Sequence, residues 1–153
     1  MEERLAVIRQ IHAICHPRSV AVVGVPRGLK TGRLFLMALQ DQGFPGPIYP
    51  INPRIDEIDG LKVYPSVAAV PGEIDLAIVL VPHDQALDVI RECAAKHVRG
   101  AVLFTAGYKE TGTAEGAALE AEIVRIARAG GMRLIGPNGM GLYRPAAGLS
   151  FFP

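Results

Sequence analysis

The sequence predicts an α/β fold, namely a Rossmann-like three-layer α/β/α domain around a mainly parallel sheet of five to six strands. Runs of β-branched and aliphatic residues alternate along the chain with stretches whose apolar residues recur at helical spacing. The strand-like runs are apolar on both faces, which is typical of strands covered by helices on both sides. Glycine, proline and asparagine follow these runs, as they do at the ligand-binding edge of a parallel sheet.

The first half of the chain begins with a predicted helix over residues 2–14, which a proline ends at position 17. The run SVAVVGV (19–25) predicts a doubly buried strand, and the next stretch, about 30–42, predicts a helix closed by a glycine. A short strand between prolines is expected within FPGPIYPINP (44–53). The following GLKVYP (60–65) predicts a brief extended piece.

The second half repeats the alternation more clearly. IDLAIVLV (74–81) and GAVLFTAG (100–107) predict buried strands, and MRLIGPN (132–138) predicts a last one. Helices are expected over 83–98 and 114–129. The second of these carries acidic residues early and arginines late, as the helix dipole favours. Strands that alternate with helices in this way form a parallel sheet.

Length and composition restrict the class of protein. The 153 residues suffice for one domain. We expect residues 1–16 to form a helix packed on the domain and residues 17–153 to form a single Rossmann-like domain. The 16 basic and 15 acidic residues give a net charge of +1, which argues against a nucleic-acid partner. The absence of a long apolar run and of a signal-peptide pattern predicts a cytoplasmic protein without a membrane partner.

The cysteines and histidines do not indicate a metal centre. The two cysteines form no CxxC pair, and none of the four histidines stands at a zinc-type spacing. No pair of carboxylates, GxSxG elbow or Walker motif indicates catalysis. We therefore expect no metal and name no catalytic residue. The oligomeric state stays open, a homo-oligomer included.

The loop after the first strand predicts a phosphate-binding turn. Its glycines (Gly24, Gly28, Gly32) do not have the GxGxxG spacing, because position 26 is a proline. A loop with little side-chain bulk still lets backbone N–H groups meet a phosphate at a helix N-terminus, and nearby cations, Arg33 among them, add positive charge. The alternative is a tight turn with solvated basic residues. The candidate binding residues here are Gly24, Val25, Pro26, Arg27, Gly28, Lys30 and Thr31.

The end of the second strand indicates which nucleotide is bound. NAD-binding folds usually place an acidic residue there for the ribose hydroxyls. This chain has Asn52, Pro53 and Arg54 instead. An arginine favours a phosphate on the ribose, as in NADP or coenzyme A (CoA). A proline-fixed turn with an exposed arginine explains the same residues, and both interpretations stay open.

Three further strand ends supply the remaining candidate binding residues. At the first, a proline prevents the strand from continuing and is also expected to form a flat apolar wall. The second offers small residues with free backbone amides. The third is a dense turn, GPNGMG, whose asparagine can both donate and accept hydrogen bonds. These residues are Val81 and Pro82, then Thr105, Ala106 and Gly107, and then Asn138.

Six segments, in order along the chain, resemble the N-terminal CoA-binding domain of NDP-forming acyl-CoA synthetases, which is similar to the α subunit of succinyl-CoA synthetase. The segments are PRSVAVVGV, GFPGPIYPINPR, GLKVYPSVAAVP, IDLAIVLVP, GYKETG and GPNGMGL. The likeness runs from about Pro17 to the C-terminus. At two places the chain departs from the family: residues 24–26 read GVP where GAS is common, and Gly139 replaces the cysteine of GPNC.

This resemblance implies a Rossmann-like domain that binds CoA, or acyl-CoA, at its strand ends. It implies that residues 24–28 meet the CoA phosphates and that residues 52–54 lie near the adenosine end. It places Val81 and Pro82 beside the ligand. It also places residues 105–107 along the thiol-bearing arm and Asn138 near the reactive end.

The resemblance further implies partners. In the family, a histidine of a following domain carries the phosphoryl group and an ATP-grasp part charges it, and none of the four histidines here matches that motif. We therefore expect a domain or subunit of an ADP-forming acid–thiol ligase that binds CoA and does not turn over alone. A stand-alone CoA-binding regulatory protein is the first alternative. An NAD(P)-binding redox domain is the second, and the missing acid and GxGxxG motif argue against it.

Overall fold

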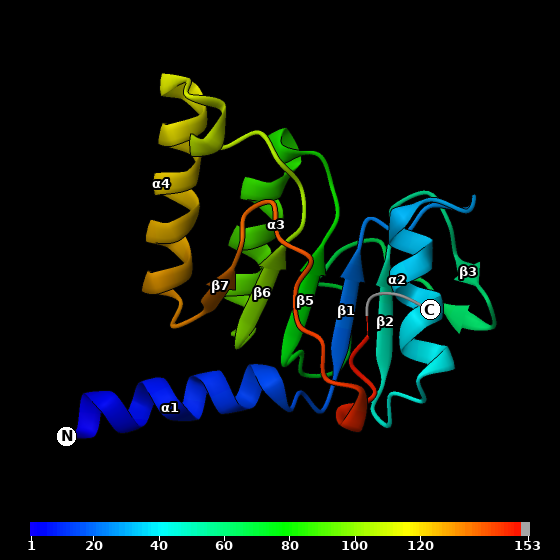
Figure 1. Ribbon diagram of the computed structural model, residues 1–153. Helices are drawn as coiled ribbons and strands as arrows, with labels where there is room; N and C mark the ends of the chain where they lie inside the picture. Colours follow the sequence, from blue (N-terminus) through cyan, green and yellow to red (C-terminus); the bar gives the residue numbers. More distant parts are fainter. Residues whose placement is uncertain (151–153) are drawn as a thin grey trace.

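The computed structural model describes residues 1–150 and shows a parallel sheet between two covering layers (Figure 1). Five strands lie in the order β2-β1-β5-β6-β7, and each pairs with its neighbours in parallel. The strands are β1 (Val20–Val23), β2 (Ile48–Ile51), β5 (Leu76–Val79), β6 (Gly100–Leu103) and β7 (Arg133–Ile135). The predicted α/β class with a mainly parallel sheet is therefore confirmed.

Four α-helices and a small hairpin accompany this sheet within residues 1–150. The helices are α1 (Glu2–Cys15), α2 (Thr31–Asp41), α3 (His83–Ala95) and α4 (Ala114–Ala129). The stretch predicted as a brief extended piece is one arm of an antiparallel hairpin, β3 (Glu57–Ile58) with β4 (Leu61–Lys62). Short 3-10 turns cover Lys109–Thr111 and Pro145–Ala147.

Alternate residues of each strand contribute to two separate cores. On one face of β1, Ala21 and Val23 belong to the core that α3 and α4 cover. On the other face, Val20 and Val22 belong to a second core, to which α2 contributes Phe35. All four residues of β1, β5 and β6 are buried, which is why their sequences are apolar throughout.

The second face of the sheet is covered partly by α2 and partly by residues 136–150, which we call the strap. The strap follows β7 and crosses the sheet without forming an α-helix (Figure 1, orange to red). Its Leu149 is fully buried in the second core. A Cβ at Gly148 would lie 2.6 Å from the Cα of Phe44, so only a glycine allows this approach. The strap is thus seated directly on the chain that follows α2.

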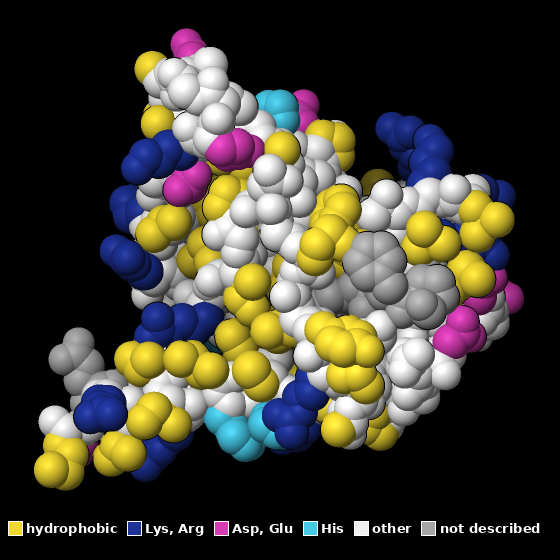
Figure 2. Space-filling model, in the orientation of Figure 1, with side chains coloured by type: hydrophobic (Ala, Val, Ile, Leu, Met, Phe, Trp, Pro, Cys, Tyr) yellow, Lys and Arg dark blue, Asp and Glu magenta, His cyan; other side chains and the backbone are white. Residues whose placement is uncertain are grey.

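Helix α1 lies along the amino edge of the sheet, where the strands begin, and touches the domain on one side (Figure 1). Ile14 is buried, and the side chain of Gln10 donates to the carbonyl of Gly131 and accepts from Nε of Arg133. Hydrophobic side chains nevertheless gather on the surface of α1 (Figure 2). The apolar row that predicted the helix is about half exposed: Leu5 45%, Ile8 52% and Ile11 47%. The helix therefore contacts the domain through Gln10 and Ile14, which lie outside that row.

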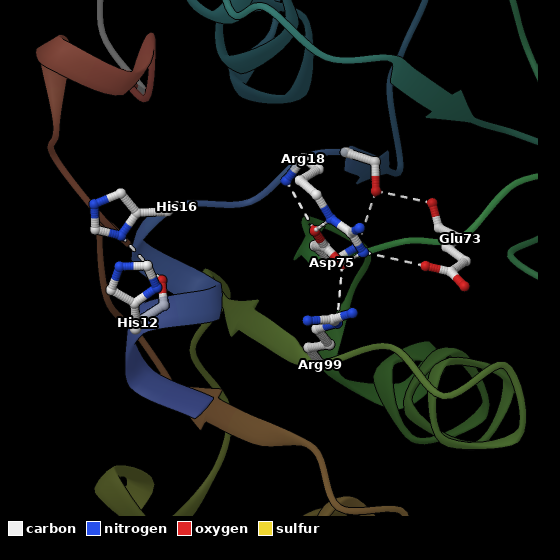
Figure 3. A network of polar contacts seen from close by, with 7 residues as sticks. His12, His16, Arg18, Glu73, Asp75 and Arg99 are labelled. Atoms are coloured by element: carbon white, nitrogen blue, oxygen red, sulfur yellow. Dashed lines mark hydrogen bonds and ion pairs between the residues drawn. The ribbon is translucent and has the colours of Figure 1, made fainter. Parts of the chain in front are cut away.

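A buried carboxylate, Asp75, joins three segments at the amino edge (Figure 3). Its Oδ2 accepts from the backbone N–H of Arg18 at 2.8 Å and from the Arg18 Nε at 3.1 Å. Its Oδ1 lies 3.0 Å from Nε of Arg99, and its backbone N–H donates to Ser19 Oγ. Burial opposes ionisation, but the bonds from Arg18 and the charges of both arginines outweigh it and hold the pKa of Asp75 below its ordinary value.

We expect Asp75→Asn to lower the free energy of unfolding by about 2 kcal/mol at pH 7, because a buried charge-assisted network loses its anion. The lowered pKa of Asp75 means that the carboxylate stabilises the fold above about pH 4 and that this contribution disappears as the pH falls through the folded pKa. Urea unfolding at pH 7 and pH 3 measures both effects.

The control for this variant is Asp88→Asn, because Asp88 pairs with Arg91 on the exposed surface of α3. That change should cost less than about 0.5 kcal/mol. A difference between wild type and Asp75→Asn that is as large at pH 3 as at pH 7 would contradict the assigned role.

Candidate functional site

The sheet order places a crevice at the carboxyl ends of β1 and β5. From β1 the chain passes through α2 to β2 on one side of β1. It then returns to β5 on the other side and passes through α3 to β6, and α2 and α3 cover opposite faces of the sheet. Ligands bind in open α/β sheets where the strand order reverses in this way. A pocket of about 500 Å³ lies at that point. It is lined by six predicted residues: Gly24, Asn52, Pro53, Arg54, Val81 and Pro82.

Gly24 lets three strand ends meet beside this pocket. Its φ is +96°, and its N–H donates to the carbonyl of Ile51 at 2.9 Å, which ties the end of β1 to the end of β2. A Cβ at this position would lie 3.2 Å from the backbone nitrogen of Val81, just beyond β5. Glycine is therefore needed for both conformation and space.

The other two glycines of the loop differ from each other. A Cβ at Gly32, in the first turn of α2, would lie 2.8 Å from the carbonyl oxygen of Gly24 and 3.0 Å from Cδ of Pro26. Gly32 thus allows α2 to pack closely against the β1 loop, which is the role of the third glycine in dinucleotide folds. Gly28 is exposed and would meet nothing within 4 Å.

Asn52 fixes the turn that carries Arg54. Its Nδ2 donates to the carbonyl of Val25 at 2.8 Å, and its Oδ1 accepts from the backbone N–H of Arg54 at 2.8 Å. Its own backbone N–H donates to the carbonyl of Tyr64. Both ends of the carboxamide are therefore engaged within the protein. The sequence indicated a binding residue, and the structure shows that Asn52 positions the loop.

The cations of the site differ in how they are used. Arg54 is exposed at the pocket, and an Nη of Arg27 approaches the Arg54 carbonyl at 3.5 Å. Lys30 is exposed at the N-cap of α2, directly before Thr31. Arg33, by contrast, is paired with Asp59 and also donates to the Arg27 carbonyl. The positive charge that the sequence indicated at Arg33 is therefore paired within the protein.

The remaining predicted residues lie along the same edge of the sheet but outside the residues that line the pocket. The Thr105 hydroxyl donates to the carbonyl of Val81 at 3.2 Å, and the Thr105 carbonyl accepts from the Asn138 N–H at 3.1 Å. The N–H of Gly107 donates to Glu110 at 2.8 Å, and this bond is the main cause of the lowered pKa of Glu110. The sequence predicted a free amide at Gly107, but in the structure this amide is bonded to Glu110.

A wall of the pocket that sequence reasoning missed comes from α3. Gln85, Asp88, Val89 and Glu92 line it at spacings of three and four residues, so they share one face of the helix. Glu92 also accepts from the N–H groups of Val67 at 2.9 Å and Ala68, which fixes the facing loop. The sequence signal was this polar face of a helix that begins directly after a strand end.

These features define a Rossmann-like domain of the class that holds a nucleotide cofactor at the reversal point of a parallel sheet. The chain belongs to the CoA binding domain family, which matches residues 18–145. The predicted resemblance and the predicted cofactor, CoA, are thereby confirmed. No helix among residues 1–150 is apolar over the length that a membrane crossing requires. No cluster of three or more metal-binding side chains occurs in that range either.

Similar domains occur within ligases. The chain is 42% identical over 137 residues to the α subunit of the ADP-forming acetate–CoA ligase II of Pyrococcus furiosus, covering 88% of this chain and 29% of that subunit. Its structure resembles the dinucleotide-forming acetyl-coenzyme A synthetase 1 of Ca. Korarchaeum cryptofilum, with a TM-score of 0.88 and 42% identity over 94% of this chain and 31% of that one. The chain thus spans less than a third of these ligase chains.

A smaller solved protein is also similar. A conserved hypothetical protein of Pyrococcus furiosus has a TM-score of 0.59 and 29% identity to this chain. The match covers 76% of this chain and 92% of that protein, so a similar domain also occurs with little else attached.

Replacement by alanine should affect the free energy of unfolding differently at Gly32 and at Gly28. A helical glycine replaced by alanine ordinarily gains about 1 kcal/mol. Gly32→Ala should instead lower the free energy of unfolding by about 1–3 kcal/mol, because its Cβ meets the carbonyl of Gly24. Gly28→Ala is the matched control and should change it by less than about 0.5 kcal/mol. Urea unfolding measures both, and a stabilised Gly32→Ala would contradict the close packing of α2.

Proposed function

We propose that the crevice at the ends of β1, β2 and β5 binds the 3′-phosphoadenosine end of CoA. The carrying observation is Arg54, which is exposed at a 500 Å³ pocket where NAD-binding folds have a carboxylate. A guanidinium there favours a ribose phosphate through charge-assisted hydrogen bonds. Asn52 supports this role, because it fixes the backbone of Arg54 and leaves the side chain exposed.

The rest of the cofactor extends along the carboxyl edge, because CoA is longer than the pocket. The β1 loop, with the first turn of α2 and the exposed Arg27 and Lys30, faces the pyrophosphate. Val81 and Pro82 form the apolar wall beside the pantetheine arm. Thr105, Ala106, Gly107 and Asn138 lie further along the same edge and guide the thiol.

The ligase chemistry belongs to parts outside these residues. The similar ligase chains are more than three times as long as the match. We infer that this domain presents the CoA thiol to ligase domains on the same chain or a partner subunit, where an acid is activated at the expense of ATP. The domain by itself binds CoA without forming a thioester.

A stand-alone CoA-binding protein is the second candidate function. It is favoured by the small Pyrococcus furiosus protein, nearly all of which the match covers. The reading frame after residue 153 in the gene distinguishes the two functions, because the ligase role needs further domains or a neighbouring ligase gene.

Thermal unfolding with added cofactors tests the proposed ligand. CoA at about a hundred times its Kd should stabilise the chain by about 2.7 kcal/mol, a rise in Tm of about 5–10 °C. NADH and NADPH at equal concentration should leave the Tm unchanged. A rise with either nicotinamide cofactor and none with CoA would instead identify a redox domain.

Arg54→Glu should weaken CoA far more than dephospho-CoA, because only CoA carries the ribose 3′-phosphate. Reversal of the charge should raise the Kd for CoA at least about tenfold. Calorimetric titration of both ligands gives the comparison. The control is Arg128→Glu, since Arg128 is exposed on α4 away from the crevice. Equal losses for CoA and dephospho-CoA would reject the assigned contact.

A further inference from the structure

A second concave site lies at the amino edge of the sheet, at the opposite ends of the strands from the CoA crevice. A pocket of about 490 Å³ separates α1 from the segments that begin β1, β5 and β6. Its lining includes Arg9, His12 and His16 from the α1 side and Arg18 and Arg99 from the sheet side. Ile8 and Ala13 add an apolar part, and the only carboxylate among the lining residues is Asp75.

Asp75 holds the two sheet-side arginines in place, and both of its carboxylate oxygens are engaged in these contacts. Its Oδ2 accepts from Nε of Arg18, its Oδ1 forms an ion pair with Nε of Arg99 at 3.0 Å, and it is 2% exposed (Figure 3). An Nη of Arg18 also pairs with Glu73 at 3.2 Å, so Arg18 is shared between two carboxylates while Arg99 contacts Asp75 alone. Among residues 1–150, the Nη groups of Arg99 form no hydrogen bond or ion pair. Asp75 therefore orients the Arg99 guanidinium and leaves its Nη donors available for a ligand.

The α1 wall adds further positive charge and donors. Arg9 makes no hydrogen bond or ion pair with the other residues that the structure describes. The rings of His12 and His16 are stacked with centroids 4.0 Å apart, as Figure 3 shows. Arg144 approaches the same pair, with its Nη1 3.2 Å from Nδ1 of His16. The four arginines in and beside the pocket, namely Arg9, Arg18, Arg99 and Arg144, thus exceed the two carboxylates, Asp75 and Glu73, by two charges.

We propose that this pocket binds a phosphoryl group, either as inorganic phosphate or as the monoester of a small metabolite. Forked guanidinium donors from opposite walls match the several oxygens of a phosphate. The surplus of positive charge matches its double negative charge. Ile8 and Ala13 provide contact for the organic part of a monoester. The proposal does not depend on CoA, because the two sites lie at opposite ends of the strands.

Amide chemical shifts of the 153-residue chain, titrated with phosphate at constant ionic strength in chloride, test the site. We expect saturable shifts at residues 9–18 and at Arg99. Arg9→Gln should raise the Kd for phosphate about tenfold, since it removes one charged donor without breaking a recorded contact. Arg128→Gln, on α4, removes the same charge elsewhere and should leave the Kd unchanged.

Two more arms make the result decisive. Arg54→Gln should not alter the phosphate Kd. If it does while Arg9→Gln does not, phosphate binds at the carboxyl edge and the proposal fails. Shifts that do not saturate, or that chloride reproduces, also overturn it. Phenyl phosphate distinguishes the ligand: tighter binding than inorganic phosphate assigns the site to a phosphate ester, and equal binding assigns it to inorganic phosphate.

Discussion

The close approach between Gly24 and the end of β5 is the constraint on which the carboxyl edge depends. Strand order reverses at β1, so the loops after β1 and β5 leave the sheet towards opposite faces. A side chain at position 24 would press against the backbone of Val81 and widen this junction. With glycine there, the N–H of residue 24 also reaches the carbonyl of Ile51. One small residue thus aligns the three strand ends that form the crevice.

Some polar side chains around this junction are bonded within the protein and hold its loops, and others remain exposed to a ligand. Asn52 uses both ends of its carboxamide within the protein, and Glu92 holds the facing loop by two backbone amides. Arg33 is consumed by Asp59. The side chains of Arg27, Lys30 and Arg54 remain exposed. In the proposed complex, a ligand phosphate would meet charged side chains on a loop whose backbone is already held, which lowers the ordering cost of binding.

Much of the fold was predictable because local pattern and final environment agree. Helix α4 spans the predicted residues, since its apolar face and its Thr113 cap lie where the chain itself encodes them. The strands were evident because both of their faces are buried. The face by which α1 contacts the domain was not predictable, because a row of aliphatic residues predicts a helix without saying what covers it. The contacts of Ile14 and Gln10 depend on distant segments.

The candidate site was predictable as an edge and less so as individual contacts. The rule that ligands bind at strand ends selects Gly24, Arg54 and Val81, and the structure brings these three residues together at one pocket. It could not show that Glu110 occupies the amide of Gly107, because that bond follows from the turn geometry of the loop. The polar face of α3 was missed for a different reason. The apolar residues of α3 predict a helix that packs inward, but they do not indicate what its polar face borders, which is the pocket.

The strap gives the domain an unusual dependence on its last residues. Where many α/β domains close the second face with another helix, here an extended run of chain shields the aliphatic side chains of the central strands. A fragment that ends just after β7 would retain every strand and α-helix of the described residues, yet it would expose a hydrophobic surface of the sheet to water. A shortened version of this domain made for expression must therefore include the chain through Leu149. This holds although the last α-helix of the described residues ends at Ala129 and the last strand ends at Ile135.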